Sequence, residues 1–118
     1  VDDRKIGLKA NIGYAMELNN KAETLTFGNH LLKYNLDKGT REDHFLGSNT
    51  VGGEPLFAPN PNSKDEKDGY VMSIVHDNEK NKSKLIIIDT DDFSNKPVAE
   101  ILLPQRVPFG AHGSWLEN

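Results

Sequence analysis

The chain has 118 residues, enough for one ordinary domain, with 14 Lys and Arg residues against 18 Asp and Glu residues, a formal net charge of -4. Because the basic residues are few and scattered, the composition argues against a nucleic-acid partner and against adsorption to an anionic membrane. The absence of cysteine excludes a disulfide scaffold, a thiol nucleophile and a cysteine-based metal site. It also fits a reducing compartment, so we expect a cytoplasmic location.

No segment predicts membrane insertion or secretion. The longest apolar run, residues 85–88, is far too short to span a bilayer, and the first residues lack the basic and apolar stretches of a signal peptide. The chain begins with Val1 rather than Met, and we expect it to be a piece of a longer protein.

The first half of the chain predicts strands joined by polar turns. Apolar residues alternate with polar or small ones over residues 12–18, a period of two that is typical of a half-buried strand. A short apolar group follows at 25–27, and the alternation returns over 32–36. Residues 37–40 have the composition of a turn, with Gly39 free to take a positive φ, so residues 41–46 are predicted to return as the partner strand of a hairpin.

The second half has the same character. Residues 54–59 are extended but contain prolines, and further strands are predicted at 70–76, 85–88 and 98–103 with polar loops between them. Residues 85–88 are apolar on both faces, which predicts a central strand covered on both sides. Hairpins at near-regular spacing without helices predict an all-β fold of antiparallel strands. This pattern fits a sandwich, a barrel or about two propeller blades of roughly four strands each.

His112 is the first candidate metal ligand. Glycines at positions 110 and 113 let the backbone approach a crowded centre, which is one way to present a ligand. No second histidine lies near enough in sequence to form a local metal motif, so any partner ligands come from distant chain. The alternative is a histidine in a surface loop after the last strand.

Glu54 is the second candidate. It follows two glycines and directly precedes Pro55 at the start of an apolar segment, where a carboxylate is either exposed or buried with a partner. A buried glutamate often holds a ligand histidine through the ring nitrogen that faces away from the metal. The alternative is an exposed loop residue.

The other three histidines match no local metal signature and are predicted to lie at the surface: His30, His44 and His76. No serine-nucleophile motif, phosphate loop or dinucleotide fingerprint is present.

Three stretches, in this order, carry a resemblance to a known family. They are residues 53–59 (GEPLFAP), 68–73 (DGYVMS) and 103–115 (LPQRVPFGAHGSW), of which the last is the most specific. Together they resemble the C-terminal part of the carotenoid cleavage oxygenase family, which includes stilbene-cleaving dioxygenases. The resemblance spans nearly the whole chain.

The resemblance implies a fold and a metal site. The family fold is a seven-bladed β-propeller whose axis holds a non-haem Fe(II) bound by four histidines. Residues 1–118 would then be the C-terminal part of one propeller domain, about two blades of it. By similarity, His112 stands at the final iron-ligand position, and Glu54 stands where a glutamate hydrogen-bonds a ligand histidine. The other three ligands should lie upstream of Val1.

The implied reaction is oxidative cleavage of a carbon–carbon double bond of a carotenoid, apocarotenoid or stilbene to two carbonyl products. Its partners would be dioxygen, an apolar alkene and the upstream remainder of the propeller. No catalytic residue beyond the metal site and no substrate-binding residue is predicted. Since one ligand cannot hold iron, the isolated chain is predicted to be inactive. The alternatives are a non-catalytic β-module with a binding role and an unrelated β-sandwich.

Overall fold

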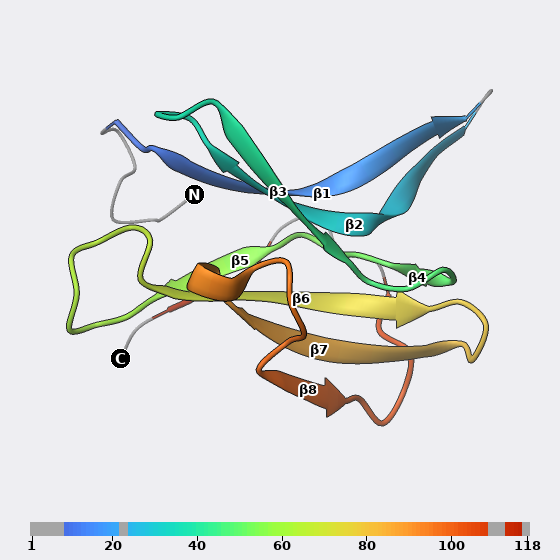
Figure 1. The fold of residues 1–118 in the computed structure, drawn as a ribbon. Coiled ribbons are helices and arrows are strands. Elements are labelled where there is room, and N and C mark those ends of the chain that lie inside the picture. Colours follow the sequence, from blue (N-terminus) through green and yellow to red (C-terminus); the bar gives the residue numbers. More distant parts are fainter. Residues whose placement is uncertain (1–8, 22–23, 109–112, 117–118) are drawn as a thin grey trace.

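A computed structural model of the chain describes residues 9–21, 24–108 and 113–116, and in this part the fold is all-β (Figure 1). Eight strands and one short 3-10 turn follow one another within these described residues. They are β1 (Ile12–Lys21), β2 (Thr24–Asn35), β3 (Thr40–Phe45), β4 (Thr50–Val51), β5 (Leu56–Pro59), β6 (Gly69–Asp77), β7 (Lys82–Asp89), η2 (Thr90–Asp92) and β8 (Ala99–Leu102). The predicted all-β class and antiparallel pairing are confirmed.

The first sheet is a three-stranded antiparallel meander in the order β1-β2-β3. Ile12 pairs with Asn35 at one end of the first hairpin, and a bulge falls between Met16 and Leu18. Gly39, which was predicted to be free to take a positive φ in the turn between β2 and β3, has a φ of 65°. The hairpin that was predicted from residues 32–46 is therefore confirmed.

The second sheet has the order β4-β6-β7-β8, and β5 also pairs with β6. All its pairings are antiparallel. As predicted, residues 85–88 form a central strand, with β6 on one side and β8 on the other. Ile86 and Ile88 are buried, whereas Leu85 and Ile87 on the opposite face are only half-buried by the described part of the chain. The sheets contain three and five strands rather than four each.

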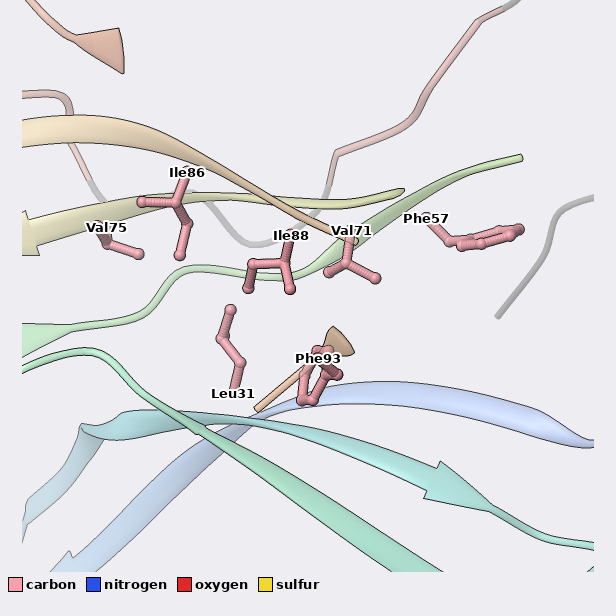
Figure 2. Packing of buried hydrophobic residues seen from close by; sticks show 7 residues of the cluster. All are labelled: Leu31, Phe57, Val71, Val75, Ile86, Ile88 and Phe93. Carbon is pink, nitrogen blue, oxygen red and sulfur yellow. The ribbon is translucent and has the colours of Figure 1, made fainter. Parts of the chain in front are cut away.

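The core lies between the two sheets (Figure 2). Alternation along β6 and β7 turns Val71, Val75, Ile86 and Ile88 toward the first sheet, where Leu31 of β2 meets them. Phe93 follows η2 and is fully buried in the same cluster, with its ring centroid 6.0 Å from that of Tyr14 on β1. The aromatic side chain therefore joins the two sheets into one unit.

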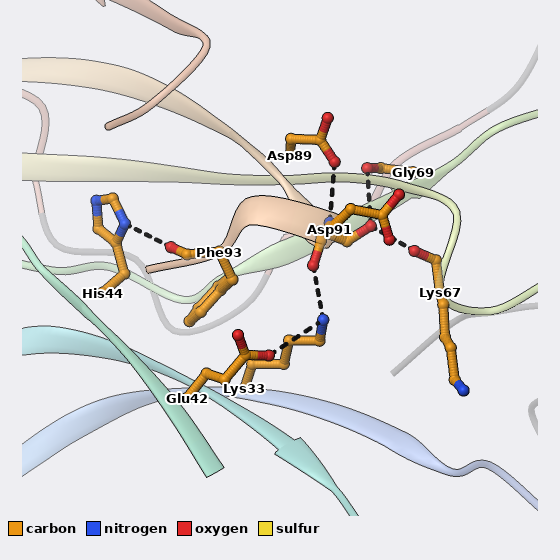
Figure 3. Close-up of polar contacts among 9 residues, drawn as sticks. Lys33, Glu42, His44, Lys67, Gly69, Asp89, Asp91 and Phe93 are labelled. Atoms are coloured by element: carbon orange, nitrogen blue, oxygen red, sulfur yellow. Dashed lines mark hydrogen bonds and ion pairs between the residues drawn. The ribbon is translucent and has the colours of Figure 1, made fainter. Parts of the chain in front are cut away.

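Polar contacts around η2 fix the edge of this interface (Figure 3). Lys33 on β2 donates from Nζ to the carbonyl of Thr90 at 2.6 Å. The Thr90 side chain, which is 1% exposed, donates to the carbonyls of Lys67 and Gly69. The turn that leads into Phe93 is therefore held by both sheets.

His44 corrects one prediction. It was expected at the surface because charged residues precede it, but its side chain is buried and its Nδ1 lies 2.7 Å from the carbonyl of Phe93. The period of two explains the difference, since His44 alternates to the inner face of β3 while its neighbours point to solvent.

Candidate functional site

Glu54 lies in the short connection between β4 and β5, and the backbone there is held closely against β6. The amide of Gly53 donates to Ser73 Oγ at 3.2 Å, and the same hydroxyl donates to the carbonyl of Gly53 at 3.1 Å. A Cβ atom on Gly53 would lie 2.6 Å from the carbonyl oxygen of Ile74, closer than real Cβ contacts allow. The connection can therefore approach β6 only with glycine at this position.

The Glu54 side chain reaches the C-terminal motif. Its Oε2 accepts a hydrogen bond from the amide of Gly113 at 2.8 Å, across 59 positions of sequence. The two sequence-predicted segments, 53–59 and 103–115, thus meet at the predicted carboxylate. Glu54 is half-buried. Its exposure is therefore intermediate between the two alternatives, a buried carboxylate with a partner and an exposed loop residue.

His112 lies outside the described residues, so its role as a metal ligand stays a prediction. Gly113, the next residue, is described and is packed against β5, because a Cβ atom there would lie 3.1 Å from Leu56 Cδ1. The Glu54 carboxylate therefore contacts the backbone immediately after the predicted ligand.

The segment before the motif is fastened to the β6–β7 hairpin. The amide of Leu103 donates to the Ser83 carbonyl at 3.1 Å, and the amide of Val107 donates to Ser83 Oγ at 2.9 Å. Arg106 donates to the side-chain oxygens of Asn81 at 2.8 Å and Asn78 at 3.3 Å. These bonds hold residues 103–107 along one end of the second sheet.

His76 corrects a second prediction. It was expected at the surface, but it is 1% exposed, and its Nδ1 lies 2.9 Å from Ser83 Oγ. Burial lowers the pKa of the His76 imidazole below 6.5, and the positive charge of Arg106 lowers it further. His30, by contrast, is half-buried, and its Nδ1 lies 2.7 Å from Glu17 Oε2.

A cavity of about 350 Å³ borders these segments on the outer face of the second sheet. Its walls are mainly apolar and include Leu56, Ile74, Leu85 and Trp115, with Glu54 as the acidic group at its edge. A carboxylate beside an apolar cavity can hold a ligand ring or a backbone amide, but it supplies no reaction by itself. Any chemistry here requires further groups.

The described residues contain no group of three or more His, Cys, Asp or Glu side chains that could hold a metal ion. The residues at hand nevertheless fit an imidazole-bound metal, because a carboxylate oxygen is placed beside the backbone of the predicted ligand segment. Nor, in the described part of the chain, is there a helix with the length and apolar character to cross a membrane.

Sequence reasoning missed the residues that support the two loops: Ser73, His76, Ser83 and Arg106. Nothing in their local sequence marks them, since each lies in an ordinary strand, turn or loop pattern. Their hydrogen-bond partners lie between 7 and 28 positions away in the sequence. Such pairs are recognised only when the fold is known.

Comparison with known proteins supplies a family. The family described as retinal pigment epithelial membrane protein matches residues 1–117. The chain is 38% identical over 88 residues to a chloroplastic 9-cis-epoxycarotenoid dioxygenase of Arabidopsis thaliana, covering 75% of this chain and 15% of that protein.

Solved structures resemble nearly the whole chain. The lignostilbene dioxygenase of Pseudomonas brassicacearum matches with a TM-score of 0.89 and 28% identity, over 99% of this chain and 26% of that one. A cobalt-substituted form of the Synechocystis enzyme ACO matches with a TM-score of 0.80 and 23% identity, over 95% of this chain and 23% of that one. The chain thus spans about a quarter or less of the length of these proteins, and the two sheets correspond to part of a β-propeller.

Proposed function

Because the chain belongs to the retinal pigment epithelial membrane protein family of carotenoid cleavage oxygenases, we propose that it is the C-terminal portion of a non-haem Fe(II) dioxygenase. Residues 1–118 would be part of a single propeller domain. The proposed reaction cleaves one C=C bond of a carotenoid, apocarotenoid or stilbene. The observation that carries the proposal is the hydrogen bond between Glu54 and Gly113, since Gly113 directly follows the predicted ligand His112 in the sequence.

In this proposal, His112 holds the metal together with three histidines from upstream chain. Glu54 holds the ligand segment in place, so that the imidazole keeps one orientation and one tautomer. Neutral imidazoles suit Fe(II), and four of them leave coordination positions open. The similar Synechocystis ACO structure is cobalt-substituted, which supports a metal in this fold.

The reaction balances without a further reductant. The C=C bond and the O–O bond break, two C=O bonds form, the alkene carbons are oxidised and dioxygen is reduced. Fe(II), when bound, would supply the redox chemistry that joins dioxygen to the alkene. The chain's own contribution is to hold one ligand and to present apolar walls that keep water away from the metal.

The outer face of the second sheet is apolar and exposed, which supports the proposal that upstream chain packs against it. Tyr70, Ile74 and Ile101 are 46%, 37% and 48% exposed there, next to the half-buried Leu85 and Ile87. A contiguous apolar sheet face of this kind is typical of a surface that another element covers. We propose that the remainder of the propeller covers it, and that the isolated chain neither retains Fe(II) nor consumes oxygen with an alkene.

The test uses the full-length protein that contains these residues. We expect the purified protein to bind about one Fe(II) per chain, and to convert a stilbene or an apocarotenoid to two carbonyl products with uptake of one O2 per cleavage. Labelling with 18O2 should place isotope in the products. Binding of an apolar ligand without metal or oxygen uptake would instead support the non-catalytic module. The cytoplasmic location expected from composition stays a prediction.

A further inference from the structure

Ser83, at the start of β7, joins the β6–β7 hairpin to the segment that leads toward His112. The residue is 2% exposed and bonds this segment twice, through its carbonyl to Leu103 and through its hydroxyl to Val107. Val107 lies five positions before His112 and directly before Pro108. Because the proline has no amide hydrogen, the Val107 amide is the last backbone donor before residue 109 of the C-terminal motif.

His76 completes this contact from the neighbouring strand. It pairs with Ser83 across the β6–β7 ladder, and its Nδ1 lies 2.9 Å from the Ser83 hydroxyl. A serine hydroxyl rotates freely unless its neighbours fix it, and here a ring nitrogen and a backbone amide both bond Oγ. The imidazole is fully enclosed, so its bond to the hydroxyl is protected from competition by water.

The predicted ligand segment is therefore held on both sides. Upstream, Val107 is bonded to Ser83, and downstream, Gly113 is bonded to Glu54. Arg106 strengthens the upstream side through two asparagines of the hairpin turn. Val107 and Gly113 flank His112 in the sequence, so chain connectivity links both hydrogen bonds to this residue.

We infer that Ser83 and His76 are a pair of positioning residues that fix the backbone leading to His112 and thereby the geometry of the metal site. This inference rests on the proposed function, and it extends the support of the ligand beyond Glu54. The pair acts on the ligand segment through its backbone.

The test compares four variants of the full-length protein, with Co(II) and Fe(II) as the probes. Ser83→Ala removes the acceptor of the Val107 amide, and His76→Leu removes the ring nitrogen. His76→Asn keeps a polar atom near the position of Nδ1. His44→Leu is the matched control, because it removes a similarly buried imidazole with a 2.7 Å bond from the other sheet.

Ser83→Ala is expected to speed hydrogen exchange at the Val107 amide about tenfold and to raise the Co(II) dissociation constant about tenfold. His76→Leu should change both quantities in the same direction, and His76→Asn should restore most of the parent values. The visible absorption of bound Co(II) should shift in Ser83→Ala and not in His44→Leu, which lowers stability only.

The outcomes separate this inference from the proposed function. If the parent protein binds no Co(II) or Fe(II), the proposed function fails, and the exchange rate at Val107 still tests whether the pair holds the backbone. If the parent binds metal but Ser83→Ala and His76→Leu match His44→Leu in metal affinity and absorption, the positioning role is wrong and the dioxygenase proposal stands.

Discussion

Replacement of Gly53 by alanine tests how closely the Glu54 connection is held against β6. The added Cβ would lie 2.6 Å from the carbonyl oxygen of Ile74, whereas ordinary contacts begin at 3.4 Å. That oxygen belongs to the backbone of β6, where Ile74 pairs with Leu85 of β7, so it cannot retreat far. The Gly53 backbone must instead move by about 0.8 Å to reach ordinary contact distance.

A shift of this size has two consequences. It weakens both bonds between Gly53 and Ser73, and the combined strain should lower the free energy of unfolding by about 1–3 kcal/mol. If Glu54 moves with its neighbour, its 2.8 Å bond to Gly113 lengthens beyond hydrogen-bond range, and metal affinity should fall about tenfold.

Gly13→Ala is the matched control. Gly13 lies in β1 with no other atom within 4 Å of an added Cβ, so this change should leave stability unchanged or raise it by about 0.4–1 kcal/mol. Urea unfolding and metal titration of both full-length variants provide the comparison. Equal stability and equal metal affinity in the two variants would refute the close contact between Gly53 and β6.

Further predictions concern the core and the buried histidine. Phe93→Ala should cost about 3–5 kcal/mol of stability in urea unfolding, because the ring is fully buried between the sheets, whereas Leu102→Ala, at a side chain 79% exposed, should cost little. An equal loss in both would contradict the assigned core. Because the pKa of His76 is lower in the native than in the unfolded state, the unfolded state binds more protons, and stability should fall as the pH drops below 6.5 toward the native pKa. The slope is at most about 1.4 kcal/mol per pH unit and should flatten in His76→Asn. Arg106 is the charged group that lowers the pKa of this ring together with burial, and a slope unchanged in the variant would assign the effect to another group.

Local patterns predicted most strands because each depends on residues close in sequence. The alternation over residues 12–18 predicted β1, and the turn chemistry at Gly39 predicted the hairpin of β2 and β3. Strand β4 escaped prediction because two residues, Thr50–Val51, are too few to show a period. A period of two also says which residues share a face, but not which face another sheet covers, and this explains the wrong surface assignment of His44.

The candidate site was predicted only in part. Glu54 and the C-terminal motif were identified from the sequence, and the structure brings them into contact. The supports of the two loops, Ser73 and Ser83, have no local signature, because their roles arise from strand register and loop path. Buried serines that bond a distant backbone are visible only after the fold is known.

Iron content of the full-length protein with His112→Ala, beside the parent and His30→Ala, tests the central claim most directly. His30 bonds Glu17 within the first sheet and has no assigned role at the metal, so it controls for the loss of a histidine as such. The parent and His30→Ala should retain equal iron, and His112→Ala should bind iron at least about tenfold more weakly. Unchanged iron affinity in a folded His112→Ala protein would remove this residue from the metal site.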